Sequence, residues 1–269
     1  MSRVFFKISV GFLLLALILL AGAFSFSYYY LDQQGRLVAA GNLKGAMDSA
    51  QKAARLNPFN PDPLGAESYI LQQQGRNKEA ANALRQAIDR DPNNYATYLF
   101  LGNLQMYSLD DLNAAEASYR KMLQLNPKAT AATQGLAQAL LRQGDLKASR
   151  KQYERLQEEK SISPQGLYEL GRIYVRTGEP EKGEQTIKSA RRRLLGQLKT
   201  MEGSQKTQTE DLLRSMTLAI ADALVVQGNY DKARSILENS DAQQAPAILE
   251  LLNSNPELYR DSVKSSAIY

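Results

Sequence analysis

The chain has 269 residues, a net charge of +5, and no cysteine, histidine or tryptophan. Without cysteine and histidine it has no disulfide, no thiolate nucleophile, no lipid-modified N-terminal cysteine, no Ser-His triad and no imidazole metal ligand. Its 33 basic and 28 acidic residues nearly balance, whereas nucleic-acid binders concentrate basic residues on one face. We therefore expect no cofactor, no metal site and no nucleic-acid partner.

The first predicted element is an apolar helix. No charged residue occurs between Lys7 and Asp32, and residues 8–26 are almost all apolar. About 20 apolar residues suffice to cross a bilayer as a helix, and insertion of the large apolar side chains contributes roughly 4–7 kcal/mol. Three tyrosines follow at 28–30, as in the aromatic belt at a membrane surface. Residues 1–31 are therefore predicted to be a membrane anchor that contacts the bilayer through residues 8–30.

A removable signal peptide is the alternative for this segment, because the Ala-Gly-Ala tripeptide at 21–23 resembles a cleavage site. The apolar stretch continues beyond it to residue 26, which favours an uncleaved anchor. Arg3 and Lys7 lie closer to the apolar stretch than the basic residues after it, which favours a cytoplasmic N-terminus. We expect a single-pass membrane protein whose remaining residues lie outside the cytoplasm.

A period of 34 residues runs through the rest of the chain. Gly41 and Gly75 are 34 residues apart, and Gly178 follows Gly144 by the same interval. Three units close with a proline that stops their second helix: Pro58, Pro92 and Pro127. The second helix of each unit opens with a small residue that lets two helices approach closely: Ala46, Ala80, Ala115, Ser149, Gly183 and Ala233.

This pattern resembles the tetratricopeptide repeat, a 34-residue unit of two helices. The Leu-Gly pair of its first helix occurs as Leu101-Gly102 and Leu170-Gly171, and Tyr174 matches its tyrosine. The family's tryptophan is absent, and the last three units lack the closing proline. The resemblance implies an all-α superhelical solenoid of about six repeats over residues 32–247, preceded by one transmembrane helix and followed by a capping helix and tail at 248–269.

One repeat is longer than the others, because Gly228 follows Gly178 by 50 residues instead of 34. We place the insertion near residues 198–213. Helix-forming residues flank Gly203 and Ser204, so we expect two overlong helices joined by a polar turn, with the tip of this hairpin protruding from the solenoid.

The densest basic cluster lies just before this insertion. Its members are Lys188, Arg191, Arg192, Arg193 and Lys199. We interpret it as a solvated helix face, with contact to phosphate or anionic lipid as the alternative.

The resemblance also implies a binding surface, because in this family the first helix of each pair lines the concave face. The residues carried over to that face are Tyr69, Gln73, Asn103, Tyr107, Gln138, Arg142, Tyr168, Arg172 and Arg176. Such side chains offer flat aromatic contacts and hydrogen bonds to an extended backbone, and arginine favours an acidic segment. We expect a protein or peptide partner, with Arg172 and Arg176 pointing into an open groove.

Together these features predict a bacterial-type, membrane-tethered scaffold or adaptor that binds protein and acts in assembly of the cell envelope. A structural spacer or self-associating scaffold is one alternative, and an enzyme is another. The carboxylate pairs Glu158-Glu159 and Asp110-Asp111 lie on predicted helix faces or turns, and no glycine-rich phosphate loop follows a strand. The sequence therefore predicts no catalysis.

Overall fold

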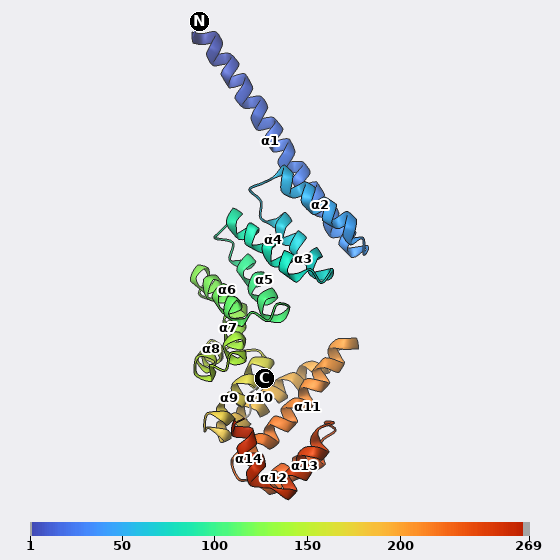
Figure 1. The fold of residues 1–269 in the computed structure, drawn as a ribbon, viewed down its shortest axis with the longest axis vertical. Helices are drawn as coiled ribbons and strands as arrows, with labels where there is room; N and C mark the ends of the chain where they lie inside the picture. The colour runs from blue at the N-terminus through green and yellow to red at the C-terminus, as the bar shows by residue number, and fades with distance from the viewer. Residues whose placement is uncertain (1, 266–269) are drawn as a thin grey trace. The chain divides into compact units, whose positions relative to one another are not determined.

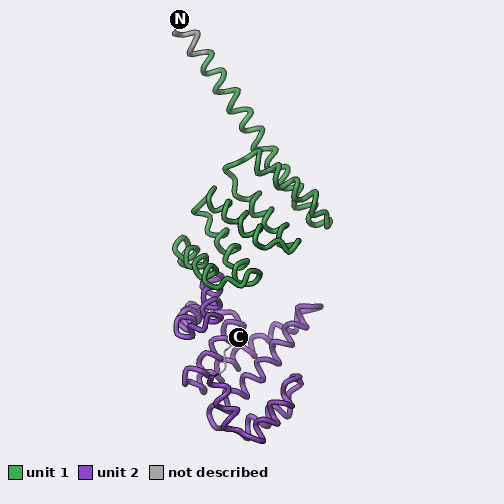
Figure 2. The backbone as a smooth tube through the Cα atoms, viewed as in Figure 1, with its two compact units in different colours: residues 1–128 green, residues 129–269 purple. Residues whose placement is uncertain are grey.

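The protein is described by a computed structural model that covers residues 2–265, with side chains from Ile8 onward. All regular structure in this range is helical, and the helices follow one another as helix–turn–helix pairs (Figure 1). This confirms the all-α solenoid fold expected from the 34-residue period. The chain forms two compact units, residues 1–128 and residues 129–269 (Figure 2), each with its own hydrophobic core.

Unit 1 contains three helix pairs, in which α1 packs on α2, α3 on α4, and α5 on α6. The helices are α1 Ser2–Ala39, α2 Leu43–Leu56, α3 Asp62–Gln73, α4 Asn77–Arg90, α5 Tyr95–Tyr107 and α6 Leu112–Leu125. Successive pairs are joined by packing of α2 on α3 and of α4 on α5. The small residues that open the second helices are completely buried, namely Ala46, Ala80 and Ala115. Their size lets the helices of each pair approach closely, as the sequence predicts.

Helix α1 contains both the apolar N-terminal segment and the first helix of the repeats, with no break between them. Its segment Ile8–Ala39 is long and apolar enough to cross a membrane, with a mean hydropathy of 2.5 in the most apolar window and none of that window buried. The first buried side chain of its described part is Ser27, whose Oγ donates to the carbonyl of Ala53 on α2 at 2.8 Å. The apolar segment therefore continues into the first repeat helix with no linker between them.

The turns within the pairs depend on residues with positive φ. Gly75 and Gly144 have φ of 72° and 86°, a region in which a Cβ atom is disfavoured. In the turn between α5 and α6, which has one extra residue, Asp110 takes this role with φ of 54°. The next residue, Asp111, then caps α6 by accepting a hydrogen bond at Oδ1 from the Ala114 amide at 3.0 Å.

Unit 2 contains three further pairs and two short C-terminal helices. They are α7 Thr130–Arg142, α8 Leu146–Glu158, α9 Pro164–Arg176, α10 Pro180–Leu198, α11 Gly203–Val226, α12 Tyr230–Glu238, α13 Ala245–Ser254 and α14 Pro256–Ser265. Helices α10 and α11 have 19 and 24 residues, which matches the two overlong helices expected from the insertion. Their connection lies at 199–202, so Gly203 begins α11 instead of occupying the turn.

The C-terminal segment forms two helices, and the second does not simply stack on the end of the array. Helix α14 packs against α11 and α9, which are the first helices of successive pairs. Its side chains Tyr259 and Val263 are buried, with 6% and 4% exposure, and belong to the core of unit 2. Their spacing of four residues places both on one face of α14.

Candidate functional site

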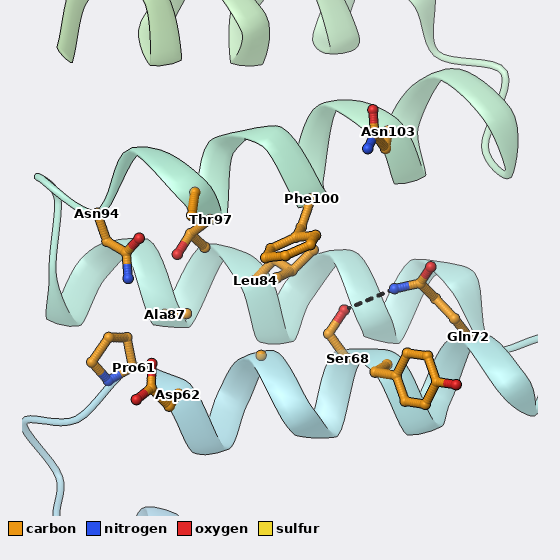
Figure 3. A pocket seen from close by; sticks show the side chains of 13 residues that line it. Pro61, Asp62, Ser68, Gln72, Leu84, Ala87, Asn94, Thr97, Phe100 and Asn103 are labelled. Carbon is orange, nitrogen blue, oxygen red and sulfur yellow. Dashed lines mark hydrogen bonds between the residues drawn. The ribbon is translucent and has the colours of Figure 1, made fainter. Parts of the chain in front are cut away.

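Unit 1 carries a cavity of about 490 Å³ between α3 and α5, with α4 beneath it. Figure 3 shows Phe100 of α5 directed toward α3, above Leu84 of α4. The cavity is lined by Pro61, Asp62, Gly65, Ser68, Tyr69, Gln72, Leu84, Ala87, Asn94, Ala96, Thr97, Phe100 and Asn103. Small side chains at Gly65, Ala87 and Ala96 leave this space open. Its volume lies within the usual range for ligand sites.

Two aromatic side chains offer apolar surface at this cavity. Tyr69 of α3 is 48% exposed and Phe100 of α5 is 58% exposed, although aromatic side chains of this size gain free energy from burial. Leu84, which is 1% exposed, forms part of the floor between them. The cavity can therefore receive an apolar side chain of a partner between two rings from different helices.

One polar group at the cavity has a fixed orientation. Asn103 Oδ1 accepts a hydrogen bond from Tyr119 Oη at 2.8 Å. Burial raises the pKa of Tyr119, so this phenol remains a neutral donor over the physiological pH range. Because the amide oxygen is engaged, the amide nitrogen of Asn103 is the atom that can donate to a ligand carbonyl. Among the lining residues, all within the described chain, Asp62 is the only ionised one.

The predicted site residues of unit 1 divide between the cavity and its surroundings. Tyr69 and Asn103 line it. Gln73 and Tyr107 are exposed one turn further along α3 and α5, outside the lining. Sequence reasoning missed Phe100, which lies three residues before Asn103 and therefore on the same helix face. The available signal in the sequence was a phenylalanine at this spacing, on the helix face that also carries Asn103.

In unit 2 the corresponding face is largely covered. Gln138 and Arg142 on α7 are half-buried. Tyr168 on α9 is only 8% exposed, and burial raises its pKa to about 12. Arg172 places its guanidinium 5.3 Å from the centre of the Tyr168 ring and pairs with a carboxylate of the same helix. These residues therefore do not present the open aromatic and basic surface that the sequence predicts.

The carboxylate paired with Arg172 is Glu169, at 3.1 Å between Nη1 and Oε2. The exposure of the two side chains is 18% and 3%, so this ion pair is mostly buried. Arg176, one turn further along α9, is also half-buried, and burial lowers its pKa. The positive charges of Arg172 and Arg176 act on Asp222 of α11, whose own pKa burial raises. The hydrogen bond from α14 to Asp222 and these two charges work against that rise.

Helix α14 contributes to this difference at α9 and α11. Tyr259 Oη donates a hydrogen bond to Asp222 Oδ1, and α14 contacts both α9 and α11. The chain's own C-terminal helix thus lies on the first helices of two pairs in unit 2. The expectation that Arg172 and Arg176 point into an open groove is therefore wrong, because both side chains are half-buried and their charges act on Glu169 and Asp222.

Comparison with known proteins gives a consistent picture of the repeats. Residues 66–130 and residues 106–165 each match a family model described as tetratricopeptide repeat. A search of curated protein sequences finds no match. Among solved structures, a tetratricopeptide repeat protein from Parabacteroides merdae is 16% identical in sequence with a TM-score of 0.62. The matched region covers 91% of this chain and 94% of the other protein's chain.

Two further structures show the same fold. The Pseudomonas aeruginosa pilF protein is 16% identical with a TM-score of 0.61, covering 91% of this chain and 99% of its own. YrrB, described as a tetratricopeptide protein with an unusual peptide-binding site, is 19% identical with a TM-score of 0.52, covering 60% of this chain and 82% of its own. At these identities the likeness shows the fold alone. The matched models identify residues 66–165 as tetratricopeptide repeats, and the stacked helix pairs of the described chain have the same fold.

Proposed function

We propose that this protein is a membrane-tethered scaffold that holds an extended segment of a partner protein in the α3–α5 cavity, in assembly of the cell envelope. The observation that carries the proposal is the pair Tyr69 and Phe100, two exposed rings from different helices beside an amide of fixed orientation. Rings bind apolar side chains, and the Asn103 amide donates to a backbone carbonyl. Peptide binding by YrrB, a protein of the same fold, supports this class of ligand.

The tether is the apolar part of α1. Its exposed leucine, isoleucine and phenylalanine side chains between residues 8 and 26 have no protein surface to cover them within the described chain. Cleavage after residue 23 would leave the buried contacts of α1 intact, because they begin at Ser27. The intact mass of the membrane-extracted protein separates a retained anchor from a removed signal peptide. A cysteine-labelling assay at engineered cysteines in unit 1 then tests the proposed position outside the cytoplasm.

The chemistry of the cavity also sets the kind of segment that it binds. Asp62 is the one charged side chain among its lining residues, and Arg172, one of the arginines that favoured an acidic ligand, is paired with Glu169 in unit 2. We therefore propose an uncharged, apolar-containing segment with an affinity in the micromolar range, about −8 kcal/mol. Such binding changes little with salt, whereas capture of an acidic segment weakens as the Debye length falls from about 10 Å at 0.1 M to about 3 Å at 1 M.

The test is photocrosslinking in intact cells with a benzophenone amino acid at position 100 or at position 59. Phe59 is a matched control, because it is 74% exposed and lies outside the cavity lining. We expect a discrete adduct from position 100 and none from position 59. Tyr69→Ala should abolish the adduct, and Asn103→Ala should weaken it. Asn93→Ala, in the exposed turn before α5, should leave it unchanged. Equal adducts from both positions, or an adduct insensitive to Tyr69→Ala, would contradict the proposal.

A further inference from the structure

A second cavity lies in unit 2 among α10, α11 and α12, with a volume of about 850 Å³. Its apolar part is formed by Ile220 of α11 and Ile236 of α12. Ile220 is almost completely buried, so the cavity floor belongs to the core of the unit. This site shares no residue with the α3–α5 cavity of unit 1.

Three cations of α10 line one side of this cavity, namely Lys188, Arg191 and Arg192. Their spacing of three and four residues places Lys188 beside both arginines on the helix surface. Lys188 pairs with Glu184 at 2.5 Å, whereas the structure shows no carboxylate partner for either arginine within residues 8–265. None of the described lining residues is acidic. The cavity therefore has two positive charges that no neighbouring anion neutralises.

Arg191 carries a buried hydrogen-bond donor that has no acceptor. Its Nε atom is buried and has no hydrogen-bond partner in the described chain. A buried N–H of a charged group without an acceptor is costly, and buried donors in folded proteins nearly always have a partner. The neighbouring Ser235 hydroxyl, from α12, lines the same cavity and can donate to the same acceptor. An anion with several oxygens would satisfy these donors together.

We propose that the α10–α12 cavity binds a phosphate ester, with the phosphate on Arg191 and Arg192 and the organic part over Ile220 and Ile236. Two uncompensated cations match a group that carries nearly two negative charges at neutral pH, and guanidinium forks bind phosphate oxygens in pairs. The cavity is much larger than a phosphate group, and its apolar part requires an occupant with an organic portion. A soluble phosphomonoester and the headgroup of the phospholipid phosphatidate share this chemistry.

The proposal is tested by isothermal titration calorimetry on the full chain in non-ionic detergent. The probes are glycerol 3-phosphate, dihexanoyl phosphatidate and sodium sulfate at matched ionic strength. Binding of glycerol 3-phosphate assigns a soluble ester as the source, and binding of the short-chain lipid alone assigns a headgroup. Affinity should fall as the pH is lowered through about 6, where the phosphate takes up its second proton. If neither phosphate probe binds, or sulfate binds as tightly, the proposal is wrong.

Variants locate the binding within the molecule. Arg191→Lys keeps the charge but removes the buried Nε–H, and should weaken binding about tenfold, as expected for loss of a charge-assisted hydrogen bond. Arg191→Gln with Arg192→Gln should abolish binding. Lys199→Gln with Lys206→Gln removes the same charge at exposed positions outside the cavity, and should leave binding unchanged. Circular dichroism confirms that each variant is folded. Arg192→Gln alone, at an exposed residue, keeps the test informative if Arg191 variants unfold. An equal loss of affinity in the double variant Lys199→Gln with Lys206→Gln would show that the probe does not bind in this cavity.

Discussion

Tyr259 on α14 donates a hydrogen bond from its Oη to Oδ1 of Asp222 on α11. The two residues lie far apart in the sequence. Their hydrogen bond connects the last described helix to the first helix of an earlier pair. Burial raises the pKa of Asp222 and also the pKa of Tyr259. The position of α14 over α9 and α11 thus depends on a polar contact as well as on the apolar burial of Val263.

Removing this hydrogen bond should lower the stability of unit 2. Tyr259→Phe keeps the ring, which is 6% exposed, but leaves the Asp222 carboxylate without its donor. A buried acceptor that loses its partner costs about 1–3 kcal/mol. We expect a decrease of that size in the free energy of unfolding, measured by urea denaturation of the full chain in detergent.

Tyr230→Phe is the matched control for this variant. Tyr230 Oη also donates to a carboxylate, that of Glu257 at 2.8 Å, but this pair is exposed. Water can replace the lost partner there, so we expect no measurable change in the urea midpoint. Equal effects of the two substitutions would show that the Tyr259 contact contributes no more than a surface hydrogen bond.

Charge reversal on α9 should unfold the covered face of unit 2. In the double variant Arg172→Glu with Arg176→Glu, new carboxylates would face Glu169 and Asp222. Glu169 is 3% exposed, and removing one partner of a buried ion pair costs about 3–5 kcal/mol. We expect a large fall in the unfolding midpoint and loss of near-ultraviolet circular dichroism from the buried Tyr168.

The control for this charge reversal uses two exposed arginines that also form ion pairs with a glutamate of their own helix. Arg120 pairs with Glu116, and Arg155 pairs with Glu159, on α6 and α8. Converting both to glutamate changes the net charge by the same amount but buries no charge. The midpoint should then stay close to that of the wild type. A wild-type-like midpoint for the α9 variant would mean that its arginines are not needed by the fold.

Most of the fold could be predicted from the sequence because its signals are local. Proline and glycine mark the ends of helices, and small residues such as Ala46 and Ala80 mark where two helices approach. These features act within one 34-residue unit, so their period alone defines the pairs. The exact turn of the long hairpin was less well defined, because Gly203 is as compatible with the start of a helix as with a turn.

The candidate site could be predicted only in part, because exposure depends on contacts between distant segments. Tyr69 and Asn103, which the repeat pattern assigns to the concave face, both line one cavity. The same pattern places Tyr168 and Arg172 on the equivalent face of α9, but both side chains are mostly buried, and α9 contacts α11 and α14. Nothing in a ten-residue amphipathic helix says whether it stacks on the end of an array or folds back over its face. That choice is made by tertiary packing.

The stability of unit 2 should depend on pH through Asp222. Burial raises its folded-state pKa above the ordinary value of 3.8, so the folded state binds its proton more tightly than the unfolded state does. The stabilisation is therefore fully present below that value and is lost as pH rises through the folded pKa. Asp222→Asn mimics the protonated acid. The wild type should lose stability relative to this variant as the pH rises above the ordinary carboxyl value of 3.8. A difference that grows in the opposite direction would mean that the Tyr259 hydrogen bond and the charges of Arg176 and Arg172 outweigh burial.

Alanine substitution at two glycines of α10 should change the free energy of unfolding in opposite directions. A Cβ atom at Gly183 would lie 2.7 Å from the carbonyl oxygen of Gly171 on α9 and 2.6 Å from a methyl group of Val175. The backbone of α9 cannot give way cheaply, so Gly183→Ala should destabilise the protein by about 1–3 kcal/mol. At Gly196, by contrast, a Cβ atom meets nothing within 4 Å, and alanine should stabilise the helix by about 0.5–1 kcal/mol. Urea denaturation of each variant measures the change in its free energy of unfolding relative to the wild type. If alanine at 183 raised the midpoint as alanine at 196 does, the close approach of α9 and α10 would not be the reason that glycine stands at 183.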